Sequence, residues 1–235
     1  MNKLGLGLEK DLLPEGDCLL IADEAPAGFK VFDPTKHCIN PFNQTYRRAR
    51  DLASIFYGME GKDTLTVRNG KRALTRAFME AKNLDIKFGT SDADKEAEAL
   101  LDDLKLSPVL SKIFNTTNTV LKGRICARVN RAELGDFDTK IIGSVLALLY
   151  PGTVVIEDFG FYARDFHKTL LRENRLRIGV NSLEELDSEM KQMVLLIEEK
   201  EGRKCTFEDA KILANYSGLI SGTNAHGAFV ERAMN

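Results

Sequence analysis

The sequence is poor in the residues that build metal centres and disulfide frameworks. Its 235 residues include only four cysteines and three histidines. The cysteines lie far apart, at positions 18, 38, 126 and 205, and no C-x-x-C pair occurs. The histidines show no metal-ligand spacing. These absences argue against a zinc site and a disulfide scaffold, and they favour reduced thiols in a cytosol.

Long apolar runs and a strong net charge are also missing. No run approaches the ~20 apolar residues that span a bilayer, and the amino terminus lacks the pattern of a secretory signal. We therefore expect a cytoplasmic protein without a membrane segment. The formal charge of −2 gives no overall attraction to nucleic acid. Any DNA binding would therefore have to use a local basic patch.

The phosphate-loop motif G-x-x-x-x-G-K-[ST] does not occur. Residues 58–64, GMEGKDT, have the wrong spacing, and residues 69–72, NGKR, lack the first glycine and the hydroxyl. Gly5-x-Gly7 has no predicted strand before it, so it gives little support to a dinucleotide loop. Without such a loop, no backbone cradle surrounds a β-phosphate and no hydroxyl binds magnesium.

The clearest architectural signal lies between Pro151 and Leu186. The apolar run TVVI ends in Glu157 and Asp158, and a second run, LRIGV, ends in Asn181. Short apolar runs bounded by turn residues are typical of strands buried on both faces, and the segment between them is helix-like. We predict a parallel β-α-β unit whose strand-end polar residues lie where open α/β sheets bind ligands.

The remaining elements extend this pattern over one domain, residues 1–235. Further strands are predicted at 18–21, 29–32 and 119–129, and the spacing of the first two allows a hairpin. Helices are predicted to begin at Thr45, Asn69 or Gly70, Ser91, Ser107, Asp136 or Asp138, Ser182 and Thr206. The predicted fold is α/β, a mostly parallel sheet flanked by helices, with a helical insertion or subdomain at residues 46–115.

Glu157 and Asp158 are the sharpest candidates for chemistry. Carboxylates after a buried strand can hold Mg²⁺, usually through water, and can polarise an attacking water. Such a metal suits phosphate chemistry, because it neutralises charge on phosphoryl oxygens. The structural alternative is a pair of strand-end acids that cap the next helix or pair with a nearby arginine. A third reading, a metal-dependent nuclease that uses Asp33 as well, lacks a recognisable spacing of further acids or lysines.

Asn181 and several arginines are secondary candidates. Asn181 can sense a γ-phosphate or orient water, although the adjacent Ser182 is also a helix cap. Six arginines lie near predicted strands and can clamp phosphate or pair with surface acids: Arg124, Arg128, Arg131, Arg172, Arg175 and Arg177. A further basic set decorates the second predicted helix, as a solvated face or a DNA-facing patch: Lys71, Arg72, Arg76 and Lys82.

These motifs resemble a known family. Val154 to Asp158 looks like a Walker B strand, and the segment from Arg172 to Leu186 is similar to a run in the FtsK/HerA-like DNA translocases. Val31-Phe32-Asp33-Pro34, followed by Asn40-Pro41, resembles the family's strand after the phosphate loop. The departures are the absent Walker A loop, the order Glu157-Asp158 in place of Asp-Glu, and Asn181 in place of glutamine.

The resemblance implies a P-loop NTPase-like, degenerate translocase from a viral or mobile-element setting. It implies an oligomer acting with double-stranded DNA, and ATP hydrolysis coupled to DNA movement if activity is retained. Glu157, Asp158 and Asn181 would then be catalytic, the first two as Mg²⁺ ligands. Asp33, Arg172 and Arg175 would contact the ATP cofactor. The alternative is a non-enzymatic structural or adaptor protein whose α/β core displays residues 46–115 to a partner.

Overall fold

A parallel β-sheet organises the chain in the computed structural model. The structure describes residues 3–6, 13–57, 65–82, 86–114, 119, 121–162, 167–197, 199–202, 208–209 and 211–213. Within them the sheet has seven strands, in the order β3-β4-β2-β5-β6-β1-β7, and every pairing is parallel. The strands are β1 (Lys3–Leu6), β2 (Cys18–Ala22), β3 (Lys30–Phe32), β4 (Arg124–Arg128), β5 (Thr153–Ile156), β6 (Leu176–Val180) and β7 (Glu199–Gly202).

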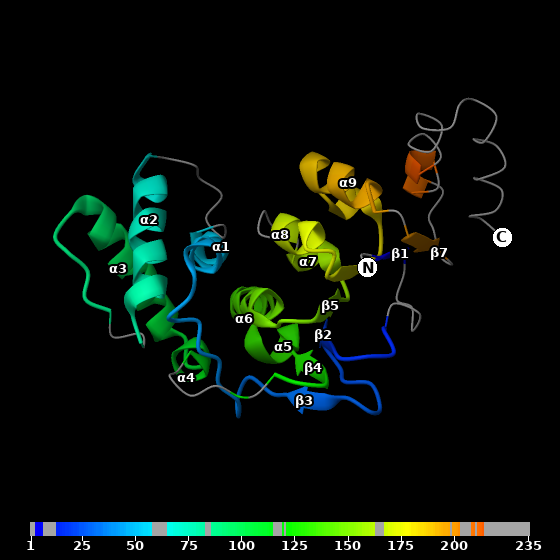
Figure 1. Cartoon of the computed structure of the whole chain (residues 1–235), viewed down its shortest axis with the longest axis horizontal. Helices are drawn as coiled ribbons and strands as arrows, with labels where there is room; N and C mark the ends of the chain where they lie inside the picture. Colours follow the sequence, from blue (N-terminus) through cyan, green and yellow to red (C-terminus); the bar gives the residue numbers. More distant parts are fainter. Residues whose placement is uncertain are drawn as a thin grey trace.

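Helices occupy most of the connections between these strands (Figure 1). Four lie between β3 and β4: α1 (Tyr46–Tyr57), α2 (Leu65–Glu80), α3 (Asp92–Leu106) and α4 (Leu110–Ile113). The later ones are α5 (Arg131–Leu134), α6 (Asp136–Leu149), α7 (Phe159–Tyr162), α8 (His167–Arg172), the 3₁₀ turn η2 (Leu183–Glu185) and α9 (Ser188–Leu195). The fold is therefore α/β, a parallel sheet flanked by helices in the manner of the P-loop NTPases, as predicted.

The strand order explains which face of the sheet the helices cover. The connections from β3 to β4, β4 to β5, β5 to β6 and β6 to β7 all advance in one direction along the sheet. Because such crossovers are right-handed, all four place their helices on the same face. The connection from β2 to β3 runs the other way, which assigns it to the opposite face.

Two hydrophobic clusters match these two faces. The larger one takes Leu19 and Ile21 from β2 and receives the buried side chains of the described helices. The smaller one takes Cys18 and Leu20 from the other face of β2, and side chains from the loops around that strand pack on it, including Phe29. Alternation along β2 thus divides a helix-covered face from a loop-covered face.

The helical block α1–α4 lies at one end of the molecule, beside α6 (Figure 1). Its helix α1 packs on α6, and Arg48 donates from Nη1 to the Leu148 carbonyl at 2.6 Å. Inside the block, the ring of Phe56 stacks on Phe78 at a centroid distance of 5.3 Å and meets Phe114 edge-on at 5.9 Å. The predicted position of the helical insertion, between two strands, is therefore confirmed.

Several local predictions are confirmed by contacts. Strands β5 and β6 pair in parallel, with Val154 opposite Leu176. Ser91 caps α3 by accepting a hydrogen bond from the Asp94 amide, and the Ser182 hydroxyl accepts one from the Glu184 amide. None of the described helices is long and apolar enough to cross a bilayer. The helix predicted from Thr206 to Tyr216 falls largely outside the described residues.

Three local predictions are wrong. Strands β2 and β3 form no hairpin, because β4 lies between them and pairs with both. Helix α2 begins at Leu65 rather than near Gly70. Gly70 lies inside the helix, and a side chain there would clash with the Tyr57 hydroxyl. The helix predicted from Ser182 breaks after η2, and Asp187 caps α9 as a second start.

The amino-terminal residues also differ from expectation. Residues Lys3–Leu6 form β1, a strand that pairs with β6 on one side and β7 on the other. Gly5 therefore lies within a parallel strand, opposite Gly179, rather than in a loop that follows one. Residues 7–12, which follow β1, lie outside the described part of the chain.

Candidate functional site

A crevice of about 360 Å³ opens at the carboxyl edge of the sheet, between the ends of β2 and β5. After β2 the chain turns towards β3, and after the adjacent β5 it turns the opposite way, towards β6. Neighbouring strands whose connections diverge form a topological switch point, where open α/β sheets bind ligands. Polar residues from four strand ends line the crevice: Asp23, Glu24, Arg131, Glu157, Asp158 and Asn181.

Glu157 continues the pairing of β5 beyond the strand, since its amide donates to the Ile21 carbonyl at 3.2 Å. By alternation its side chain lies on the same face as Val155, which belongs to the loop-covered cluster. Burial raises the pKa of the Glu157 carboxyl, and the nearby Asp23 carboxylate raises it further. A carboxylate in this position favours any ligand that brings positive charge.

Asp158 is held by its backbone and by one cation. Its φ of 51° lies in the left-handed region, which Asp and Asn tolerate better than most residues. Its carboxylate pairs with Arg131 at 3.3 Å, and the same guanidinium lies 4.3 Å from the ring centroid of Phe161. The structural alternative considered for this acid, pairing with a nearby arginine, is therefore confirmed for Asp158.

Asn181 lines the crevice together with Glu157 and Asp158, as expected because β5 and β6 are adjacent. The neighbouring Ser182 has a structural role, because its hydroxyl caps η2 and donates to Asp209 at 3.1 Å. The structure thus brings Glu157, Asp158 and Asn181 to one place. Their catalytic and metal-binding roles stay predictions.

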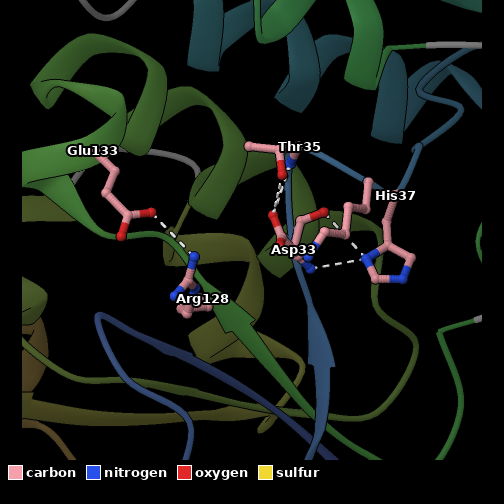
Figure 2. Close-up of polar contacts among 6 residues, drawn as sticks. Asp33, Thr35, His37, Arg128 and Glu133 are labelled. Atoms are coloured by element: carbon pink, nitrogen blue, oxygen red, sulfur yellow. Dashed lines mark hydrogen bonds and ion pairs between the residues drawn. The ribbon is translucent and has the colours of Figure 1, made fainter.

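Asp33 also lies at the carboxyl ends of the strands, but away from the crevice. It follows β3, the outermost strand of the sheet, which β4 and β2 separate from β5. Its carboxylate accepts hydrogen bonds from the Thr35 hydroxyl at 2.7 Å and the Thr35 amide at 2.9 Å, and its own amide donates to His37 Nδ1 (Figure 2). The Thr35 hydroxyl bond, with help from Lys36, lowers the Asp33 pKa to about 2. Asp33 therefore stabilises a local turn and does not line the crevice.

Arg172 and Arg175 lie at the opposite edge of the sheet, because both precede β6 whereas Asn181 follows it. Arg172 is exposed at the end of α8. Arg175 donates from Nε to the Gly152 carbonyl at 3.0 Å, to the Tyr150 carbonyl, and from Nη1 to Glu173 at 2.7 Å. The structure therefore separates both arginines from the crevice in which they were expected to contact a cofactor.

Of the other candidate arginines, Arg177 lies within β6, two contact neighbouring side chains, and one lines the crevice. Arg128 pairs with Glu133 at 3.1 Å (Figure 2), and the Arg124 guanidinium lies over the Phe29 ring at 4.6 Å. Arg131 reaches the crevice. Asp23 and Glu24 are crevice residues that the sequence interpretation missed, although they follow β2 as Glu157 and Asp158 follow β5.

The donor set of the crevice limits the metal that it fits. Four carboxylates and one guanidinium line it, so its charge is negative. Among the described residues, no group of three or more histidines, cysteines or acids is placed to hold a metal ion. Glu157 and Asp158 therefore fit Mg²⁺ only in its usual mode, bound by one or two carboxylates with waters and ligand phosphates.

Glu157→Gln is expected to stabilise the protein at neutral pH. A carboxyl with a raised pKa in the folded state destabilises the protein once it ionises. The free energy of unfolding therefore falls as the pH rises from the unfolded-state pKa, about 4.3, through the folded-state pKa. The amide removes that cost, so we expect a gain of roughly 0.5 kcal/mol at pH 7.5 that vanishes near pH 4. Urea unfolding at both pH values measures it.

The exposed neighbour Glu24 provides the control for this substitution. Glu24→Gln removes the same charge from the same crevice and should change the free energy of unfolding by less than about 0.5 kcal/mol. A loss of stability in Glu157→Gln at pH 7.5 would show that an attractive contact, rather than burial, dominates at Glu157.

No family model matches the sequence, and a search of curated proteins found no significant match.

Proposed function

We propose that this chain is a degenerate DNA-translocase-like protein of the FtsK/HerA type, which acts with DNA in an oligomer. The observation that carries the proposal is the crevice at the β2–β5 switch point, where Glu157, Asp158 and Asn181 come together. Strand-end acids with a polar residue on the adjacent strand are the arrangement expected of a nucleotide site in such a sheet.

In this proposal the crevice takes ATP together with Mg²⁺. The metal, when bound, neutralises charge on phosphoryl oxygens. Glu157 and Asp158 hold its water shell, and Asn181 orients the attacking water or contacts the γ-phosphate. Glu157 also lines the crevice, where it can polarise that water. Hydrolysis would be coupled to movement along double-stranded DNA.

A second candidate is a non-enzymatic adaptor, and the charge of the crevice favours it. Arg131 is the cation among the lining residues, and Asp158 pairs with it at 3.3 Å. The sequence has no phosphate loop to supply further donors. In this version the sheet is a scaffold that presents the helical block α1–α4 to a partner.

Titration with MgATP distinguishes the two candidates. If the crevice binds MgATP, a ligand concentration of 100 Kd adds about 2.7 kcal/mol of stability, which raises the Tm of a chain of this size by roughly 5–10 °C. Phosphate release is followed in parallel, with and without double-stranded DNA. No shift and no turnover would reject the ATPase and leave the adaptor.

Two variants make the titration specific to the crevice. Asp158→Asn keeps a residue that tolerates the positive φ but removes one carboxylate, so we expect the MgATP-induced shift to fall by at least half. Arg172→Ala at the opposite edge is the control and should leave the shift unchanged. Equal losses in both variants would contradict binding at this crevice.

A further inference from the structure

A groove of about 540 Å³ runs between α1 and α2 on the helical block. Five cationic side chains and one aromatic line most of it: Arg50, Arg68, Lys71, Arg72, Arg76 and Tyr46. Among the described residues that line the groove, none is acidic. The Tyr46 side chain is 62% exposed, and the lining is completed by Thr75 and Met79.

Charge is distributed unevenly over the helical block. Helices α1 and α2 carry seven arginines or lysines and two acids, of which Asp51 is buried. Helix α3 carries six acids and two lysines. The chain as a whole has a formal charge of −2. The positive charge of α1 and α2 is therefore a local feature of one surface, as a basic patch for a polyanion must be.

The spacing of the cations on α2 suits a ligand with repeated negative charges. Arg68, Arg72 and Arg76 follow one another at intervals of four residues, so they share a helix face about 6 Å apart. All three are exposed. Arg50 faces them from α1, on the other side of the groove.

Two of the groove arginines have contacts that are weak enough to be replaced. Arg76 reaches Asp94 at 3.7 Å, with 67% of the arginine side chain exposed, and such surface pairs contribute little. Arg72 donates to Asn69 at 3.5 Å. A phosphate group is a stronger acceptor for a guanidinium, because two of its oxygens accept two parallel hydrogen bonds.

We propose that this groove binds the phosphate backbone of nucleic acid. The arginines on its two sides contact successive phosphates, and the ring of Tyr46 packs against a sugar or base face. The inference deepens the proposed function and rests on its DNA-binding part, but it needs neither ATP nor the crevice. It assigns the DNA contact to the helical block rather than to the sheet.

Fluorescence anisotropy with labelled 20-nucleotide single-stranded and duplex DNA tests this site, without nucleotide and between 50 and 200 mM salt. Four or five phosphate contacts predict a slope of about −3 to −4.5 for log affinity against log salt. Arg50→Glu with Arg72→Glu should lower affinity at least 10-fold at 50 mM salt. The milder Arg50→Gln with Arg72→Gln should make the slope about 2 shallower.

The matched control reverses two lysines on the acidic helix. Lys95→Glu with Lys105→Glu makes the same change of charge on α3 and should alter affinity less than 2-fold. Melting temperatures of all variants establish that each is folded. DNA binding that the groove variants leave unchanged would overturn the inference while the DNA part of the proposed function stands.

Other occupants of the groove give different results. Direct binding of a labelled poly-glutamate peptide of equal charge, which the Arg50/Arg72 variants abolish, would assign the groove to acidic protein segments. Loss of self-association in the Arg50/Arg72 variants, measured by sedimentation without DNA, would assign it to the acidic α3 of a second copy. Either result, with no salt-dependent DNA binding by the unaltered chain, overturns the inference.

Discussion

Replacing Phe56 with alanine is expected to lower the free energy of unfolding by about 3–5 kcal/mol. The Phe56 side chain is only 2% exposed. Its ring lies between those of Phe78 and Phe114, so it joins α1 to α2 and to the end of α4. Truncation would leave a cavity and remove two aromatic contacts at once.

Urea unfolding followed by circular dichroism measures this loss. Phe137→Ala is a matched control, since Phe137 is 41% exposed on α6 and should change stability by about 0.5 kcal/mol or less. The buried side chains of the helical block and of the helix-covered face of the sheet belong to one continuous cluster. We therefore expect a single transition in both variants, as one domain requires.

A split transition in Phe56→Ala would give a different domain organisation. If the helical signal were lost before the sheet unfolds, the helical block would be a subdomain with its own stability. The contact between Arg48 and the Leu148 carbonyl would then be a docking contact between two units. A loss below about 1 kcal/mol would show that the site collapses around the alanine.

The sheet could be predicted from the sequence where a strand is buried on both faces. TVVI and LRIGV are mostly apolar because neighbouring elements cover both faces of these strands, and this pattern identified β5 and β6. Strand β1 has only four residues and contains Gly5, so its sequence gave no strand signal. It forms because β6 and β7 pair with both its edges, a long-range effect that local sequence does not contain.

Only half of the acidic residues of the candidate site could be predicted from the sequence. Glu157 and Asp158 follow an obvious strand, whereas Asp23 and Glu24 lie at the crevice only because β2 is the neighbour of β5. Sequence order places β3 and β4 between these strands, so their adjacency follows from the crossovers alone. The missed half of the site is thus a consequence of topology.

Strand direction, by contrast, was available from the sequence. A residue before a parallel strand lies at one edge of the sheet, and a residue after it lies at the other. Arg175 and Asn181 bracket β6, whose five residues span about 17 Å. The two side chains therefore had to lie far apart, whereas Arg131, which follows β4, had to lie at the edge that carries the crevice.

Arg175→Ala is accordingly expected to lower the free energy of unfolding by about 3 kcal/mol. The side chain is 15% exposed and bridges three groups. The Gly152 and Tyr150 carbonyls, between α6 and β5, would lose their donor. The Glu173 carboxylate would keep only the more distant Arg47 and Arg48, each at 3.5 Å. Urea unfolding measures the loss.

Arg175→Lys separates the charge of this residue from its geometry. One ammonium can replace the ion pair with Glu173 but not the fork that reaches two carbonyls, so about half of the loss should remain. The exposed Arg172→Ala should change stability by about 0.5 kcal/mol or less. A loss as small as this in Arg175→Ala would contradict the bridging role.

The increase in Tm that MgATP produces in each variant distinguishes a bridging role of Arg175 from phosphate binding. A residue that only bridges α6, β5 and β6 lowers the Tm equally with and without ligand, so the MgATP-induced increase is preserved. A residue that binds phosphate reduces this increase, even in the conservative lysine variant. We expect the increase to be preserved, because Arg175 lies before β6 while Asn181 and the crevice lie after it. A reduced increase in Arg175→Lys would instead restore Arg175 as a cofactor-binding residue and place the nucleotide at the amino edge.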